Sequence, residues 1–246
     1  MPMKTLTSAI LANLAATPLF EGLNSQDIEQ ILQHASRTTV PADSYFFHQG
    51  DQARRIYILL EGQIKVIQLT PEGQQVVMRM VNPPEIFGCV AALTGGEYPA
   101  SSQATKLCEA FCLHQDDVHR LMQVYPRMAV NAFQIMVKRT HELQDRYREL
   151  ATETVERRLA HALLRLMEQS GVRKGEQILL DMPLSRQDLA EMIGSTLYTV
   201  SRVLSSWESR GLVAAGREKI SLVQPDTLSL IAEARAFSAD IKQAPL

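Results

Sequence analysis

Short apolar runs separated by turn residues fill the chain from about residue 35 to residue 114. Three of them, at residues 45–47, 56–60 and 64–67, each lead into a turn that contains a glycine: Gly50, Gly62 or Gly73. Runs of this length, about 8–12 residues apart with turn signals between them, are typical of the hairpins of a sandwich or barrel. The pattern therefore predicts a first domain that is mainly β.

The residues ahead of this region follow a helical pattern. Apolar residues recur at helical spacing from Leu6 to Leu14, and Pro18 ends the pattern. The uncharged run between Lys4 and Glu21 is shorter than the roughly 20 apolar residues that span a bilayer. We expect an amphipathic helix here, not a signal peptide, and no membrane partner.

After Pro126 the apolar period lengthens to that of one long helix, expected at residues 131–155. Its stripe alternates steps of three and four residues: Phe133, Met136, Thr140, Leu143, Tyr147, Leu150 and Thr154. Charged residues flank the stripe, as in a two-stranded coiled coil. We expect these residues to form the dimer interface of a homodimer, with packing on the β domain of the same chain as the alternative.

Residues 184–204 have the pattern of a helix-turn-helix. Ser185 is placed to cap the first helix with Asp188 three residues later, and Gly194 turns the chain. Ser195 or Thr196 caps the second helix. The predicted inner face of that helix is Val200, Val203 and Leu204. Its exposed early turns then carry Leu197, Tyr198, Thr199, Ser201 and Arg202, which is the face that a major groove would meet.

A hairpin follows the second helix. Gly211 ends the helix, and apolar pairs on both sides of Gly216 predict two short strands with Arg217 and Lys219 at their turn, as in the wing of a winged helix. Double-stranded DNA is therefore the expected partner. The expected DNA contacts are Arg186, Ser195, Thr196, Leu197, Tyr198, Thr199, Ser201, Arg202, Arg217 and Lys219.

Composition adds limits. The 246 residues are 46% hydrophobic and 21% charged, which excludes a disordered or fibrous chain. Lys and Arg number 25 against 27 Asp and Glu, so any DNA contact depends on local placement of charge. Three cysteines are too few for a disulfide framework and favour the cytoplasm. We find no catalytic set of residues and expect no enzyme.

These patterns together predict an α+β fold in three parts. Residues 1–130 would form a mainly β domain with N-terminal helices, residues 131–155 the dimerisation helix, and residues 156–246 a winged helix-turn-helix domain. At about 100–200 residues per domain, this organisation suits the length of the chain.

The sequence resembles the cyclic-AMP receptor protein/FNR (CRP/FNR) family of bacterial transcription regulators over nearly its whole length. The motifs that carry the resemblance are Leu19-Phe20-x-Gly22-Leu23, Phe47-x-x-Gly50-Asp51, Leu60-Glu61-Gly62, Phe87-Gly88, the run at residues 184–190, and Thr199-Val200-Ser201-Arg202. The resemblance implies a dimeric regulator, more often an activator that contacts RNA polymerase. It also implies that residues 1–130 hold a cyclic-nucleotide-binding-type β-roll, which senses a small molecule, a gas or a redox signal. A β-roll module that regulates a partner protein is the alternative.

The resemblance also implies an effector site between the β-roll and the long helix. Its expected residues are Phe87, Gly88, Cys89, Tyr98, Pro99, Ala100, Leu143, Arg146 and Tyr147. Relatives that bind cyclic AMP have a glutamate and an arginine where this chain has Cys89 and Tyr98. Without a cation at residues 98–100, a buried phosphate would lack a charge-assisted partner, so we expect that cyclic AMP is not the effector.

Other family cofactors find limited support in the sequence. The FNR branch holds an iron–sulfur cluster through N-terminal cysteines, whereas this chain has no cysteine before Cys89, and three thiolates are one short of the usual four. Cys108, Cys112 and His114 could share a strand face, but buried strand cysteines are common and no metal is assigned. Haem stays open, with candidate axial ligands His48, His114 and His141. The cofactor is therefore unknown.

The resemblance assigns roles within the second helix. Arg202 matches the family arginine that reads guanine, and Ser201 would lie beside it on a base or phosphate. Tyr198 replaces the glutamate that many relatives have, and a tyrosine cannot accept from a cytosine amino group as a carboxylate does. The family's usual TGTGA or TTGAT half-sites are therefore in doubt, although a twofold dimer still requires an inverted repeat.

Overall fold

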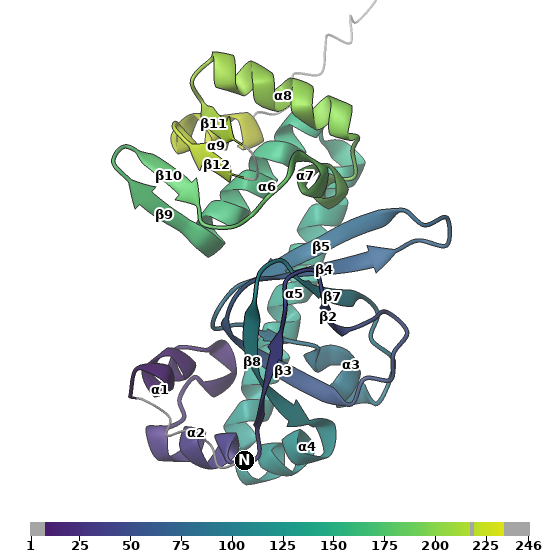
Figure 1. Cartoon of the computed structure of the whole chain (residues 1–246), viewed down its shortest axis with the longest axis vertical. Coiled ribbons are helices and arrows are strands. Elements are labelled where there is room, and N and C mark those ends of the chain that lie inside the picture. Colours follow the sequence, from purple (N-terminus) through teal and green to yellow (C-terminus); the bar gives the residue numbers. More distant parts are fainter. Residues whose placement is uncertain (1–7, 217–218, 234–246) are drawn as a thin grey trace, which may run out of the picture. The chain divides into compact units, whose positions relative to one another are not determined.

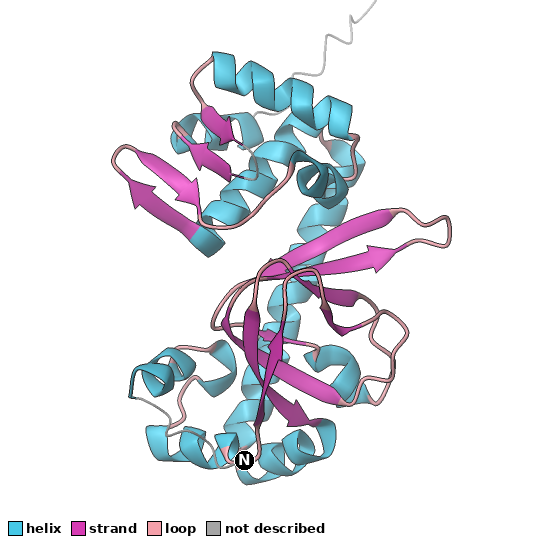
Figure 2. Ribbon diagram, in the orientation of Figure 1, coloured by secondary structure: helices cyan, strands magenta, loops and turns pink. Residues whose placement is uncertain are grey.

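The computed structural model describes residues 8–216 and 219–233. The chain divides into two compact units, residues 1–148 and 149–246, which are considered separately (Figures 1 and 2). The division falls inside the longest helix, α5 (Pro126–Thr152), so that helix contributes to both units. No helix in the described ranges is both long enough and apolar enough to cross a bilayer.

Two four-stranded antiparallel sheets form the centre of the first unit. Their strands are β1 (Ser36–Val40), β2 (Tyr45–Phe47), β3 (Arg55–Glu61), β4 (Ile64–Leu69), β5 (Gln75–Val81), β6 (Ile86–Phe87), β7 (Ser101–Ala104) and β8 (Cys108–His114). One sheet has the order β1-β8-β3-β6 and the other β2-β7-β4-β5. The strands predicted from the three apolar runs are confirmed as β2, β3 and β4.

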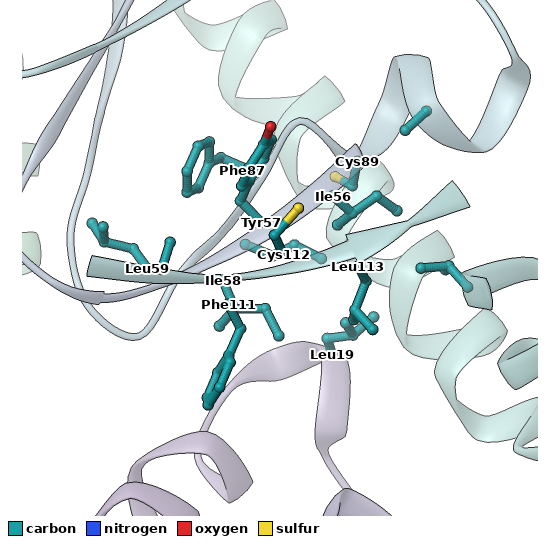
Figure 3. Packing of buried hydrophobic residues seen from close by; sticks show 14 of the residues in the cluster. Leu19, Ile56, Tyr57, Ile58, Leu59, Phe87, Cys89, Phe111, Cys112 and Leu113 are labelled. Atoms are coloured by element: carbon teal, nitrogen blue, oxygen red, sulfur yellow. The ribbon is translucent and has the colours of Figure 1, made fainter. Parts of the chain in front are cut away.

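Side chains alternate across the β3–β8 pair and fill two parts of one core. Tyr57 lies opposite Cys112 in register, and Ile58 lies opposite Phe111. Figure 3 shows Tyr57 and Cys112 on one side of the strands, with Phe111 on the other side near Leu19. Because both faces of these strands are covered, β3 is buried at four consecutive positions, unlike a strand with one wet face.

Short helices surround this core. They are α1 (Ser8–Ala15), the 3₁₀ turn η1 (Pro18–Phe20), α2 (Ser25–Leu32), α3 (Cys89–Thr94) and α4 (Gln115–Val124). The predicted N-terminal helix is confirmed as α1, although Leu6 lies outside the described residues. Asn131 of α5 is buried and donates to the carbonyl oxygens of Leu19 and Glu21, at 2.9 and 2.8 Å, which fixes the start of α5 against η1.

The long helix differs at both ends from residues 131–155. It begins at Pro126, and it ends at Thr152. Thr154 was expected in the apolar stripe, but it is the N-cap of the next helix, and its hydroxyl accepts from the Arg157 amide. That placement of Thr154 is therefore wrong, because capping a new helix competes with extending the old one.

The second unit packs three helices and a C-terminal helix on a small antiparallel sheet. The helices are α6 (Val155–Ser170), α7 (Arg186–Ile193), α8 (Leu197–Ser209) and α9 (Pro225–Glu233), and the strands are β9 (Gly171–Lys174), β10 (Gln177–Leu180), β11 (Val213–Gly216) and β12 (Lys219–Leu222), in the order β11-β12-β10-β9. The predicted winged helix-turn-helix is thus confirmed. The segment before β10 forms strand β9, and the β9–β10 hairpin turns at Gly175 with a φ of 64°.

Candidate functional site

The first helix of the helix-turn-helix begins as the sequence predicted. The Ser185 hydroxyl accepts from the Asp188 amide at 3.0 Å, and the Asp188 carboxylate accepts from the Ser185 amide at 3.0 Å. This reciprocal capping box satisfies two amides that would otherwise lack partners at the helix start. Leu189 and Ile193 are buried and fix α7 against the rest of the unit.

The turn between the two helices is held from α6. Gly194 has a φ of 62°, a left-handed conformation that glycine adopts without strain, and a Cβ there would lie 3.0 Å from Leu150 Cδ2. Arg158 donates from Nε to the carbonyl oxygen of Ile193 at 3.0 Å and from a terminal nitrogen to that of Gly194 at 3.3 Å. The angle between α7 and α8 is therefore braced by a charged side chain.

The second helix presents a polar and aromatic face. Thr196, one of the two predicted caps, is the N-cap of α8, and its hydroxyl accepts from the Thr199 amide at 3.2 Å. Val200, Leu204 and Trp207 are buried, which orients the helix. The expected contact residues at residues 195–202 divide into two groups, which are exposed Thr196, Leu197, Tyr198 and Arg202 and half-buried Ser195, Thr199 and Ser201. Tyr198 is 76% exposed, so its ring has no packing role in this unit.

One carboxylate connects both helices to the wing. Glu208 of α8 lies 3.3 Å from a guanidinium nitrogen of Arg186, and its other oxygen accepts from the Ala215 amide of β11 at 3.1 Å. Arg186, an expected DNA contact, is thus also part of the internal structure of the unit. Lys219 is exposed at the start of β12, and Arg217 lies outside the described residues.

A cavity of about 120 Å³ opens in the first unit beside the start of α3. Six of the expected effector residues line it: Phe87, Gly88, Cys89, Tyr98, Pro99 and Ala100. The other three, Leu143, Arg146 and Tyr147, do not. Leu143 and Tyr147 are exposed on α5, and Arg146 donates to the carbonyl oxygen of Met78.

Aromatic rings form one wall of the cavity. The rings of Phe47 and Tyr98 stack with centroids 3.6 Å apart and planes 13° apart. The Tyr98 hydroxyl donates to the carbonyl oxygen of Arg55 at 2.6 Å, so its polar end is already bonded. Burial, with Tyr57 nearby, raises the pKa of Tyr98. Tyr98 is therefore a neutral, apolar part of the cavity wall.

Two arginines that were not assigned to the site also line the cavity. Arg79 comes from β5 and Arg139 from α5. The expectation that a buried phosphate would lack a charge-assisted partner rested on residues 98–100 and is wrong on that point, because Arg79 and Arg139 line the cavity from other elements. No local signal identified them, since Arg79 reads as a polar strand position and Arg139 as a charge flanking the helical stripe.

The candidate haem and metal ligands lie elsewhere. His48, His114 and His141 are exposed, and none of them lines the cavity. Burial raises the pKa of the Cys108 and Cys112 thiols, and Cys108 donates to the carbonyl oxygen of Gln63 at 3.2 Å. In the described part of the chain, no group of three His, Cys, Asp or Glu side chains is arranged to hold a metal ion.

Comparison with protein families matches both units. Residues 37–125 match the cyclic nucleotide-binding domain, and residues 157–231 match the Crp-like helix-turn-helix domain.

Relatives match over most of the chain. The cyclic AMP receptor protein of Thermus thermophilus is 28% identical over 219 residues, covering 89% of this chain and 98% of its own. The global nitrogen regulator of a Nostoc species is 27% identical over 193 residues, covering 78% and 86%. Among solved structures, FixK2 from Bradyrhizobium japonicum matches with a TM-score of 0.73 at 20% identity, over 82% of this chain and 99% of that one.

Proposed function

The chain belongs to the CRP/FNR family and is a DNA-binding transcription regulator, and from this premise we propose that it acts as an effector-controlled homodimer on an inverted repeat. The observation that most directly supports this proposal is that α8 has one buried face and one exposed face. The buried face holds Val200, Leu204 and Trp207, and the exposed face holds Tyr198 and Arg202. This division leaves a helix surface free to enter a major groove. We assign activation, RNA polymerase contact, a cytoplasmic location and the lack of enzymatic activity by family analogy.

The exposed residues of α8 and the wing take different roles. Arg202 would read guanine through its O6 and N7 atoms, and Tyr198 would contact a neighbouring base without the cytosine contact that a glutamate makes. Lys219 at the wing would neutralise a backbone phosphate. Thr196 and Ser195 lie at the amino end of α8, where backbone amides suit phosphate oxygens. Base contacts then set the sequence preference, and phosphate contacts set position.

Dimerisation would use the exposed stripe of α5. Phe133, Leu143, Tyr147 and Leu150 are each more than half exposed in the single chain. Large apolar side chains in one helical stripe favour a second copy of the same helix as their cover. Two α8 helices would then face successive grooves about one helical turn apart.

Selection from random DNA duplexes tests this function. We expect the enriched sites to be inverted repeats with half-site centres about 34–36 Å, or 10–10.5 base pairs, apart. We expect the half-sites to depart from TGTGA and TTGAT because of Tyr198. Enrichment of single half-sites, or the lack of any enriched site, would contradict the proposal.

We expect that the effector is not cyclic AMP. The wall of the cavity formed by residues 98–100 offers no cation, since the Tyr98 hydroxyl is bonded to the Arg55 carbonyl oxygen and the side chains of Pro99 and Ala100 are apolar. The stacked rings of Phe47 and Tyr98 fix one wall of that space. Calorimetry of the full chain with cyclic AMP should give no saturable binding. Low-micromolar binding that also tightens DNA binding would show this expectation to be wrong.

A further inference from the structure

The cavity beside α3 is lined by two chemically different groups of residues, and this inference rests on the proposed effector-controlled function. One group is apolar and includes the stacked rings of Phe47 and Tyr98 with Pro99. The other group, which we call the charged end, is Arg79 and Arg139, whose guanidinium groups meet at the Ile86 carbonyl oxygen. Figure 3 shows Phe87 and Cys89, which line the same cavity, above the β3–β8 pair. All of these residues belong to the first unit.

Arg139 contributes a positive charge whose partners are neutral. One terminal nitrogen donates to the carbonyl oxygen of Ile86 at 2.7 Å, and the other lies 3.2 Å from the sulfur of Cys89. Within the part of the chain that the structure describes, no carboxylate lies within ion-pair distance of Arg139. A partly buried guanidinium without a carboxylate favours an anion, because a charge-assisted bond offsets the cost of removing it from water.

Arg79 adds a second charge to the same end. It pairs with Glu85 at 2.8 Å and also donates to the carbonyl oxygen of Ile86, at 3.2 Å, so both arginines share that oxygen. Burial and the charge of Arg139 lower the pKa of Arg79, which indicates that the two guanidinium groups repel each other. Two arginines against one carboxylate leave this end of the cavity positive.

We propose that the effector is a small organic acid whose carboxylate or phosphate binds between Arg79 and Arg139 while its apolar body packs on Phe47 and Tyr98. The small volume of the cavity, about 120 Å³, favours a small acid. Neither aromatic side chain offers a polar group there, since phenylalanine has none and the Tyr98 hydroxyl is bonded to Arg55. The site therefore selects an acid with an apolar or aromatic body over a fully polar one.

This acid would connect the β-roll to the dimerisation helix. Arg139 lies on α5, and Arg79 lies on β5. An anion bound to both would add a second link between these elements, which the hydrogen bond from Arg146 of α5 to the Met78 carbonyl oxygen of β5 already joins. A ligand that binds one arrangement of α5 more tightly than another shifts the population of the dimer toward that arrangement.

Calorimetry of the full-length protein tests the proposal with benzoate, phenyl phosphate and inorganic phosphate as probes, and with benzamide as the neutral match for benzoate. We expect saturable binding of benzoate or phenyl phosphate, and at least about tenfold weaker binding of benzamide and of inorganic phosphate. A preference for benzoate or for phenyl phosphate identifies the acid group. Equal binding of benzoate and benzamide, or no binding of any acid, would overturn the proposal without recourse to a variant.

Variants locate the site. Arg139→Gln should weaken binding of the preferred acid at least about tenfold. Arg120→Gln, at an exposed arginine of α4 that pairs with Asp117, should leave it unchanged. Equal affinities for Arg139→Gln and the unmodified protein would also refute the assignment. A gel shift without added acid distinguishes failure of this inference from failure of the proposed function. A protein that binds DNA but no acid refutes only this inference.

Discussion

Replacing Arg202 with alanine is expected to remove most of the preference of the protein for its own site over unrelated DNA. A bidentate contact to guanine is worth about 1–3 kcal/mol of discrimination, and a dimer makes that contact twice. The expected loss is thus about 2–6 kcal/mol, or roughly 30-fold to 10⁴-fold in the ratio of specific to non-specific affinity. Arg202 is exposed and caps nothing, so the fold should persist.

Lys219→Ala is the matched control for Arg202→Ala. Lys219 is an exposed cation of the same unit, placed at the start of β12. As a phosphate contact it should weaken binding to all sequences alike, and it should lower the slope of log affinity against log salt by about 1 for each protomer. Fluorescence anisotropy with specific and scrambled duplexes over a salt series measures both quantities. If the two substitutions changed the specificity ratio equally, the assigned roles would be refuted.

A charged residue in the exposed stripe of α5 is expected to produce monomers. Leu143 is 52% exposed in the single chain, so Leu143→Asp should cost little in the fold of one protomer. In a dimer the same side chain would face its copy, and two buried carboxylates would repel each other without partners. Sedimentation velocity should show the monomer at concentrations where the unmodified protein is dimeric.

Loss of the dimer should weaken DNA binding strongly. Two linked binding modules gain about 10²–10⁴ in avidity over one, so Leu143→Asp should cost on the order of 10² or more in affinity for the inverted repeat. Val124→Asp is the matched control, because Val124 is 67% exposed at the end of α4 and lies outside the stripe. A Leu143→Asp protein that remained dimeric would contradict the assigned interface.

The helix-turn-helix could be predicted from the sequence because it depends on short-range interactions. The capping box of Ser185 and Asp188 spans four residues, and the left-handed turn needs only Gly194. Each of these features depends only on residues within about one helical turn, so it can be predicted without knowledge of the rest of the fold. The buried face of α8 follows from helical spacing in the same way.

The charged end of the cavity could not be predicted from the sequence, because it depends on contacts between residues that are distant in the chain. Arg79 and Arg139 are far apart in the chain and meet at the carbonyl oxygen of Ile86. Neither residue has a neighbour in sequence that marks it as a ligand contact. The family motif predicts a ligand contact at residue 98, which is a tyrosine here. It does not predict that Arg79 of β5 and Arg139 of α5 line the same cavity.

The end of the long helix shows a different limit. The apolar stripe continues through Thr154 in the sequence, but a threonine before Val155 and Glu156 is also a good start for a helix. The structure takes the second option. Periodicity alone cannot decide between two such compatible patterns, since the choice depends on where the following helix packs.

The bridge made by Glu208 bears on how new target preferences can arise. Because this one side chain contacts α7 through Arg186 and the wing through Ala215, the elements proposed to contact DNA are joined by bonds that involve none of the exposed side chains of α8. Exchanging Leu197, Tyr198 or Arg202 for other residues leaves those bonds untouched. Promoter choice can therefore be re-engineered, or drift over generations, one exposed residue at a time and without redesign of the scaffold.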